Sequence, residues 1–235
     1  MERGARPALA PALAETFIRT MTVPAKICGI STPEAAHAVL DGGAAFVGFN
    51  FFPRSPRYVT PDAAARLAEP MRGGRTRIVA LAVDPDDDEL DRIVAELQPD
   101  LIQLHGHETP SRVRQVAVRA GRGVIKVLPV SGAADVDAAR EYEPVVEHLM
   151  FDAKPPKDAD RPGGLGEPFD WSLLAGRRFA RPWFLAGGLN PWNVAGAMTA
   201  TGAAFADVSS GVERGPGLKD PALIQAFLDA ARRVT

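Results

Sequence analysis

The chain has 235 residues, of which 27 are Lys or Arg and 29 are Asp or Glu, and its composition is that of an ordinary globular protein. The charges nearly balance and no basic stripe with interleaved aromatic residues is present, which argues against nucleic acid as a partner. No segment reaches the roughly 18 uninterrupted apolar residues of a membrane span. We therefore expect a cytoplasmic chain whose partner is a small molecule.

The first 22 residues are rich in Ala and Pro and carry five charged side chains. They lack the central apolar stretch of a secretory signal. We interpret residues 1–22 as an N-terminal extension and residues 23–235 as one domain, with no linker or low-complexity tract dividing it.

From Val23 onward, short apolar runs recur along the chain. The eight runs are 23–27, 45–49, 77–83, 100–104, 123–128, 146–151, 183–186 and 203–208. Continuous apolar character, rather than alternation, is typical of parallel strands that are covered on both faces.

Helical stretches of about ten residues separate the runs, and several open on a Thr, Asn or Asp that precedes Pro. The pairs are Thr32-Pro33, Thr60-Pro61, Thr109-Pro110, Asn190-Pro191 and Asp220-Pro221. Each supplies an oxygen for the helix N-cap and a Pro at the first helical position, where an N–H is not needed. Strand and helix alternating eight times predicts a single-domain (β/α)8 TIM barrel, with an open doubly wound sheet as the alternative.

In such a barrel the carboxyl ends of the strands form the active face. Several ionisable side chains come at these ends: Cys28, Arg54, Arg57, His105, Asp152 and Asp207. Cys28 is the only thiol of the chain, so it cannot form an internal disulfide, and no metal-ligand spacing surrounds it. It is either a structural cysteine or a reactive group that faces Asp152 across a pocket.

The loops after the seventh and eighth runs, 186–191 and 207–212, are rich in Gly and Ser. Glycine lets the backbone approach an anion, and Ser adds hydroxyl donors. We predict a phosphate site made by Gly187, Gly188, Ser209, Ser210 and Gly211, supported by the positive end of a helix that opens at Pro191. The alternative is that these glycines only make tight turns.

The order of motifs resembles that of the phosphoribosylanthranilate isomerase family, single-domain barrel enzymes of tryptophan biosynthesis. The motifs lie at 26–30 (KICGI), 47–59 (VGFNFFPRSPRYV), 102–106 (IQLHG), 151–154 (FDAK), 169–171 (FDW), 186–194 (AGGLNPWNV), 207–213 (DVSSGVE) and 216–220 (PGLKD). The extension precedes this pattern, and Leu165 stands where family members usually have a small polar residue.

The resemblance implies a barrel of the ribulose-phosphate-binding type. It also implies an Amadori rearrangement of N-(5-phosphoribosyl)anthranilate to 1-(2-carboxyphenylamino)-1-deoxyribulose 5-phosphate, without cofactor or metal. Cys28 would be the general base, Asp152 the general acid and Arg57 the partner of the anthranilate carboxylate. His105 and Asp207 would either contact substrate or hold the structure of the site. The protein would be a monomer or a homodimer.

An ordinary thiol has a pKa of about 8.5 and an ordinary aspartate one of about 3.9, so both would be mostly in the wrong protonation state at neutral pH. We therefore expect the site to lower the pKa of Cys28, with Lys26 nearby, and to raise that of Asp152. Trp171, Trp183 and Trp192 are expected to be packing residues.

Two other functions remain open at this point. One is another phosphate-binding barrel enzyme of tryptophan or histidine synthesis, although such enzymes would carry a Lys and Glu set or two opposed Asp residues where this chain has Cys28. The other is a non-catalytic phosphate-binding barrel that serves as a sensor or assembly subunit.

Overall fold

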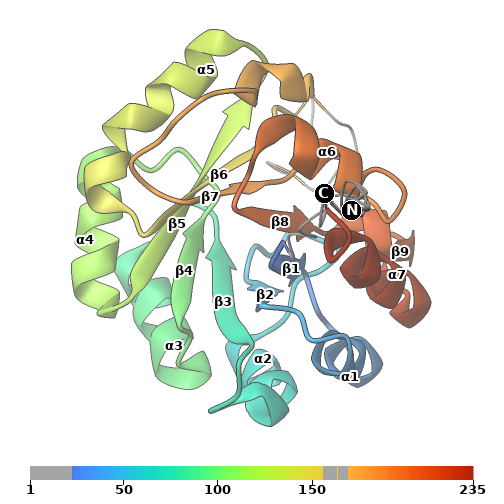
Figure 1. Ribbon diagram of the computed structural model, residues 1–235. Coiled ribbons are helices and arrows are strands. Elements are labelled where there is room, and N and C mark those ends of the chain that lie inside the picture. Colours follow the sequence, from blue (N-terminus) through green and yellow to red (C-terminus); the bar gives the residue numbers. More distant parts are fainter. Residues whose placement is uncertain (1–22, 156–162, 164–168, 235) are drawn as a thin grey trace, which may run out of the picture.

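The computed structural model describes residues 23–155, 163 and 169–234, and its eight parallel strands close into a barrel in chain order (Figure 1). The strands are β1 (Ala25–Cys28), β2 (Phe46–Asn50), β3 (Arg77–Ala82), β4 (Leu101–Leu104), β5 (Gly123–Val130), β6 (His148–Ala153), β7 (Trp183–Leu185) and β8 (Phe205–Val208). The predicted (β/α)8 barrel is confirmed. Residues 1–22 and Leu165 lie outside the described residues.

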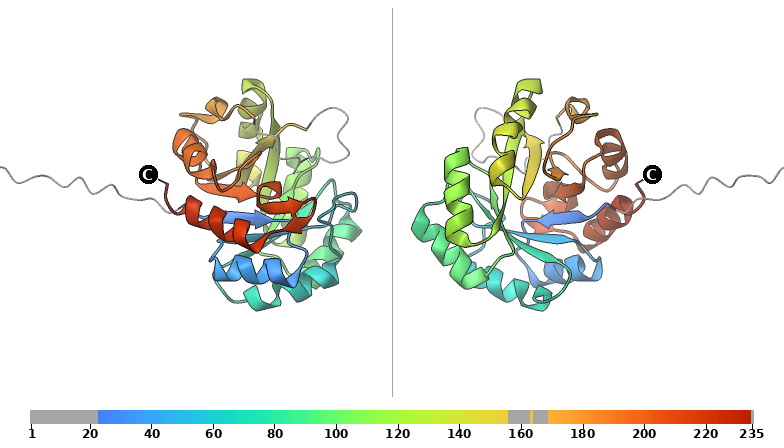
Figure 2. Two further views of the ribbon diagram at one scale, coloured as in Figure 1. Left: turned by 90° about the vertical axis from the view of Figure 1, so that its right-hand side faces the viewer. Right: turned by 60° about the vertical axis from the view of Figure 1, so that its left-hand side comes forward.

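Helices surround the barrel, and the last of them, α7, packs beside the first, α1 (Figures 1 and 2). They are α1 (Pro33–Asp41), α2 (Pro61–Ala68), α3 (Asp87–Leu97), α4 (Pro110–Ala120), α5 (Ala133–Asp137), α6 (Val194–Thr201) and α7 (Pro221–Ala231). Short 3-10 segments complete the shell: η1 (Glu69–Met71), η2 (Ala138–Glu141), η3 (Glu143–Val145), η4 (Trp171–Leu174) and η5 (Ser210–Val212). No helix in the described part of the chain is long and apolar enough to cross a membrane.

Four of the five expected helix starts are correct. The side chains of Thr32, Thr60, Thr109 and Asp220 each accept a hydrogen bond from a backbone N–H in the first turn, with Pro at the first helical position. These caps fix where the chain leaves the rim and turns down the outside of the barrel.

The fifth expected start is wrong, because α6 begins at Val194 rather than at Pro191. Asn190 Oδ1 accepts from the backbone N–H groups of Trp192 and Asn193 at 2.9 and 3.1 Å, and Asn193 Oδ1 accepts in return from Asn190 N at 2.8 Å. This side-chain turn competes with the helix and delays its start.

Four strands, β1, β2, β5 and β6, end later than the apolar runs suggest. Cys28 is the last residue of β1 and Asp152 is the penultimate residue of β6, so both side chains project from strands rather than from loops. A polar residue does not end a strand when its side chain points into a polar cavity. Both side chains therefore stand on strand backbone rather than on loops.

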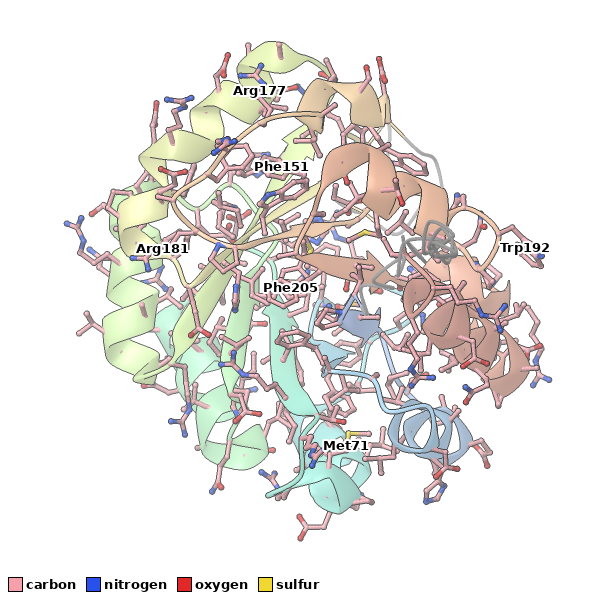
Figure 3. All side chains as sticks on the ribbon, viewed as in Figure 1. Met71, Phe151, Arg177, Arg181, Trp192 and Phe205 are labelled. Atoms are coloured by element: carbon pink, nitrogen blue, oxygen red, sulfur yellow. The ribbon has the colours of Figure 1, made fainter. Side chains whose placement is uncertain are left out.

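The strand side chains divide into an outward set that packs under the helices and a smaller inward set. Alternation along a strand gives both positions 26 and 28 to the inward face. Near the amino ends of the strands the interior is filled by Phe46, Phe184 and Phe205 together with His148. In Figure 3 Phe205 lies in the middle of the barrel.

The loop after β8 contains η5 and then a small antiparallel hairpin, β9 (Glu213–Gly215) and β10 (Leu218–Lys219). The hairpin stands beside the loop after β2, since a Cβ on Gly217 would lie 2.4 Å from the carbonyl oxygen of Pro56. Side chains from both loops thereby meet at the carboxyl end of the barrel.

Candidate active site

A cavity lies at the carboxyl end of the barrel. Its lining residues are Cys28, Asn50, Phe52, Ser55, Arg57, Leu81, Val83, Gln103, His105, Asp152, Gly163, Asp207 and Ser209. The structure thus brings six of the expected site residues into one cavity: Cys28, Arg57, His105, Asp152, Asp207 and Ser209.

A buried ion pair lies beside Cys28. Lys26 is fully buried, and its Nζ donates to Asp207 Oδ1 at 2.8 Å. A Cβ on Gly48 of the adjacent strand would lie 2.9 Å from Lys26 Nζ and 3.1 Å from Cys28 Sγ. Glycine at position 48 therefore leaves the space in which the ammonium and the thiol face each other.

The expected lowering of the Cys28 pKa is wrong. Burial raises the pKa of the thiol, and the negative charge of Asp207 adds to this, whereas Lys26 and Lys219 pull it down without overcoming burial. For Lys26, burial works to lower the pKa, but the attraction of Asp207 and Cys28 is stronger and the pKa is raised. Lys26 therefore stays an ammonium, ready to stabilise a thiolate.

Asp152 projects from β6 into the same cavity, and its Oδ1 accepts from the backbone N–H of Ala153 at 2.8 Å. His105, which follows β4, places Nε2 3.4 Å from Asp152 Oδ2. A Cβ on Gly163 would lie 2.7 Å from both Asp152 Oδ2 and His105 Cε1. One carboxylate oxygen is thus fixed by the backbone while the other meets the imidazole.

A second buried ion pair holds the loop that carries His105. Lys126 Nζ on β5 donates to Glu108 Oε2 at 2.6 Å and to the carbonyl of Gly106 at 2.8 Å. The Glu108 carboxylate in turn accepts from the backbone N–H groups of Asp84 and Gly106. His105 therefore stands on a loop fixed from beneath by charge-assisted hydrogen bonds.

Arg57 and Arg54, the two arginines of the loop after β2, have different surroundings. Arg57 is buried and lines the cavity, where its Nε and Nη2 donate to the two oxygens of Glu213 at 2.7 and 2.9 Å. Arg54 is exposed and lies over the ring of Phe52. Of the two, Arg57 is in place to meet a bound anion.

The predicted phosphate residues lie on the loops after β7 and β8. Gly187 and Gly188 have φ of +79° and +69°, in the left-handed region that favours glycine. Ser210 and Gly211 open η5, whose first internal hydrogen bond runs from Val212 N to Ser209 O, so this 3-10 turn does not use their own N–H groups. A Cβ on Gly211 would overlap the carbonyl of Leu189, which places the two loops in direct contact.

Lys219 is a third buried lysine near the site, and its Nζ donates to Glu213 Oε1 at 2.7 Å and to Ser209 O at 2.9 Å. Burial lowers the pKa of Lys219 to about 8 although the attraction of Glu213 opposes this. In Glu213 burial works to raise the pKa, but Arg57 and Lys219 outweigh it and the pKa is lowered.

The tryptophans are not all packing residues. Trp183 is buried against Phe151 and Phe179 and Trp171 is partly buried, as expected, but Trp192 is 81 % exposed and projects from the edge of the molecule in Figure 3. The side-chain turn at Asn190 holds Trp192 outside the helix, away from the core.

Sequence reasoning assigned no role to several polar residues that the structure places in or under the site. They are Asn50, Ser55, Gln103, Glu108, Lys126, Glu213 and Lys219. A signal existed for two of them: Gln103 and Lys126 are polar residues inside apolar runs. A polar residue in a buried strand, two positions before a rim residue, faces the interior and needs a partner there.

A closed (β/α)8 barrel with a thiol, a carboxylate and a buried arginine around one cavity at its carboxyl end defines an enzyme of the barrel class. Within the described residues no cluster of three or more His, Cys, Asp or Glu side chains could hold a metal ion.

The particular family follows from comparison with known proteins. The family model described as N-(5'phosphoribosyl)anthranilate (PRA) isomerase matches residues 25–230. The N-(5'-phosphoribosyl)anthranilate isomerase of Caulobacter vibrioides is 63 % identical over 209 residues, covering 89 % of this chain and 95 % of its relative. The chain belongs to the phosphoribosylanthranilate isomerase family, and it is an isomerase.

Solved structures agree with this assignment. The phosphoribosyl anthranilate isomerase of Thermotoga maritima is 36 % identical, with a TM-score of 0.80 over 89 % of this chain and 98 % of that one. A second isomerase structure, in complex with reduced 1-(o-carboxyphenylamino)-1-deoxyribulose 5-phosphate, is 33 % identical with a TM-score of 0.75, and covers 89 % of this chain and 98 % of that one.

Proposed function

We propose that the protein catalyses the Amadori rearrangement of N-(5-phosphoribosyl)anthranilate in tryptophan biosynthesis, with Cys28 as general base and Asp152 as general acid. The observation that carries this proposal is the placement of a thiol from β1 and a carboxylate from β6 in the wall of one cavity, on strand backbone. One acid and one base on different sides of a substrate are what the reaction requires.

The reaction needs two proton transfers to or from the sugar. Asp152 in its acid form gives a proton to the furanose ring oxygen as the ring opens, and the anthranilate nitrogen and C1 become a protonated Schiff base. Cys28 as thiolate then removes the proton from C2, giving an enolamine that tautomerises to the ketone. Both protons are accounted for, because the thiol and the carboxylate exchange them with solvent between turnovers.

The two groups are supported differently. Of the two lysines that lower the pKa of Cys28, Lys26 has the larger effect, and its ammonium offsets the cost of forming a buried negative charge. His105 is the side chain that faces the carboxyl, with its Nε2 3.4 Å from Asp152 Oδ2. Asp207 has a positioning role, since its contact with Lys26 keeps that ammonium buried beside Cys28.

The protein binds the substrate at the two anionic ends of the substrate, the anthranilate carboxylate and the phosphate. Arg57 faces the anthranilate carboxylate, and the N–H and hydroxyl groups of the loops after β7 and β8 bind the phosphate: Gly187, Gly188, Ser209, Ser210 and Gly211. The barrel, residues 23–235, carries all of these groups, and the extension carries none of them.

A direct assay tests the proposal. Purified protein is added to freshly prepared N-(5-phosphoribosyl)anthranilate, and the decay of the intrinsic fluorescence of the substrate is followed with chromatographic identification of the product. Enzyme-dependent formation of the aminoketose is expected. Tight binding of the product analogue without any turnover would instead indicate a non-catalytic phosphate-binding barrel.

A further inference from the structure

Glu213 and Lys219, two charged residues of the hairpin after β8, have no part in the reaction as described above. Their side chains are only 4 % and 1 % exposed, although each carries a full charge when paired. Burying charges costs several kcal/mol per ion unless geometry and hydrogen bonds compensate. Their contacts therefore indicate what the hairpin does for the site.

The Glu213 carboxylate is the centre of a network of four donors. Its Oε1 accepts from Arg57 Nε and from Lys219 Nζ, both at 2.7 Å. Its Oε2 accepts from Arg57 Nη2 at 2.9 Å and from the backbone N–H of Gly217 at 3.2 Å. The two bonds to Arg57 form a fork, which fixes the plane of the guanidinium as well as its position.

Lys219 continues the network toward the phosphate loop. Its Nζ donates to the carbonyl oxygen of Ser209 at 2.9 Å and lies 3.2 Å from Ser209 Oγ. Ser209 Oγ in turn donates to the carbonyl oxygen of Cys28 at 3.1 Å. An unbroken series of polar contacts thus runs from the loop after β2, through the hairpin and the loop after β8, to the end of β1.

The stem of Arg57 is fixed as well. Gly29 has a φ of +79°, and a Cβ built on it would lie 2.6 Å from Arg57 Cδ, so the arginine stem packs directly on the backbone next to Cys28. With the stem held there and the guanidinium forked onto Glu213, the orientation of Arg57 is set before any ligand binds.

We propose that Glu213 is a positioning residue that holds Arg57 for the substrate carboxylate and Lys219 for the phosphate loop. The two ends of the substrate are then recognised by one connected network, so disturbing its centre weakens binding at both ends. This inference rests on the proposed function, because it takes Arg57 and the loop after β8 as the groups that bind the two anions of the substrate.

Charge alone predicts the opposite of this positioning role. Removing a negative charge from the site raises its positive potential and would strengthen the attraction for an anionic substrate. Loss of orientation instead weakens binding, because the guanidinium then has to be ordered by the ligand. The sign of the change in KM therefore separates the two effects.

The first experiment uses Glu213→Gln, which keeps the shape of the side chain and removes its charge. We expect KM to rise about tenfold, the lower end for a charge-assisted hydrogen bond, with kcat within about threefold once the folded fraction is measured. A purely structural role would lower the folded fraction and leave KM unchanged. An unchanged or lower KM in folded protein would overturn the proposal.

Two simple inhibitors test the link between the ends of the substrate. Anthranilate probes the carboxylate end and inorganic phosphate the other end. We expect Arg57→Ala to weaken inhibition by anthranilate only, Lys219→Met to weaken inhibition by phosphate only, and Glu213→Gln to weaken both. Inhibition by both compounds at wild-type strength in Glu213→Gln would contradict the proposal.

A second variant covers the case in which Glu213→Gln does not fold. Glu213→Asp keeps the charge but shortens the side chain by one methylene, so it cannot maintain the fork onto Arg57 and the contact with Lys219 together. A raised KM with an unchanged unfolding midpoint is expected, and a normal KM would refute the inference.

The matched control is Glu147→Gln, which removes a carboxylate paired with Arg77 at the amino end of the barrel and should leave KM unchanged. The wild-type protein separates the two proposals. If the wild-type protein forms no product, the proposed function fails; if it turns over normally and the Glu213 variants have a normal KM, only the positioning role fails.

Discussion

The two ends of the barrel interior bury polar groups in opposite ways. At the amino end, His148 is 6 % exposed and is surrounded by aromatic rings, with its centroid 5.5 Å from Phe184 and 5.2 Å from Phe205. Both ring nitrogens are buried, and Nε2 lies 3.3 Å from Glu147 Oε1. Burial accordingly lowers the pKa of His148 and keeps it neutral.

At the carboxyl end, each of three fully or almost fully buried lysines has a carboxylate partner: Lys26 with Asp207, Lys126 with Glu108 and Lys219 with Glu213. An interior that keeps charges must keep their partners too, because a lone charge would neutralise instead. The amino end is therefore a packed core, and the carboxyl end is a preorganised polar site.

The largest effects are expected for the two groups proposed to move protons at the carboxyl end. Cys28→Ser and Asp152→Asn should each lower kcat by about 10²–10⁴-fold with little change in KM, and the double variant should lose less than the product of the two. Steady-state kinetics on folded protein provide the measurement. Asp100→Asn is the control, since Asp100 also accepts a backbone N–H but lies at the amino end.

A folded Cys28→Ser protein with nearly normal kcat would contradict the assignment of the base. Cys28 would then be a buried structural cysteine, and the contrast between the two ends of the barrel could not be explained by proton transfer at this thiol.

Substrate anchoring by Arg57 should give the next largest effect. If the guanidinium contacts the anthranilate carboxylate equally in the ground and transition states, Arg57→Ala raises KM by about ten- to a hundredfold and lowers kcat much less. Arg77→Ala, which breaks an arginine–glutamate pair at the amino end, is the matched control and should leave KM unchanged. Normal kinetics of Arg57→Ala would exclude a carboxylate contact at this residue.

The raised pKa of Cys28 predicts the pH dependence. Because burial keeps the thiol protonated above its ordinary range, kcat/KM should rise with pH through the neutral region as the thiolate fraction grows. In Lys26→Met the loss of the ammonium removes an interaction that lowers the pKa of Cys28, so the pH profile of kcat/KM should move to higher pH. For each unit by which this pKa rises, kcat/KM at pH 7 should fall about tenfold. Rates of iodoacetamide alkylation of Cys28 should show the same displacement. A profile that does not move would exclude Lys26 as the stabilising cation.

The amino end predicts a change in stability without a change in activity. The unfolded chain protonates His148 near pH 6.5, whereas the folded chain does so only at lower pH, so this residue makes the protein less stable as the pH falls below about 6.5. His148→Leu should therefore lose less stability than the wild type between pH 7.5 and 5.5 in urea denaturation. Its kcat/KM should be unchanged, and a tenfold loss would show that the amino end shapes the site.

The smallest effect is expected for the extension. Deleting residues 1–20 should leave turnover within a few-fold of the full chain, because all groups assigned to the reaction follow Val23. A fall of more than tenfold, or loss of soluble protein, would show that the first residues belong to the catalytic domain.

Local signals predicted the barrel and the location of its site. Apolar runs and Thr-Pro or Asp-Pro caps describe elements through their own residues, and the ends of the runs place Cys28, His105, Asp152 and Asp207 at the same rim. The prediction failed at Asn190, where a side-chain turn defined by Asn193, three residues away, outweighs the capping signal.

The electrostatics could not be predicted in the same way. The direction of the Cys28 pKa depends on how complete its burial is and on the distances to Lys26, Asp207 and Lys219, which come together only in the folded chain. Likewise, nothing near Arg57 in the sequence indicates a fork onto Glu213, since the two residues are 156 positions apart.

Closure of the barrel between β1 and β8 also determines when the site can exist during synthesis. Lys26 and Asp207 are partners in the register of these two strands, and 181 positions separate them. A ribosome must therefore complete most of the chain before the lysine beside Cys28 gains its counter-ion, and contacts of such long range are the slowest to form. A nascent or truncated chain that lacks β8 cannot assemble the buried pair, so the pair forms only after translation has passed the last strand of the barrel.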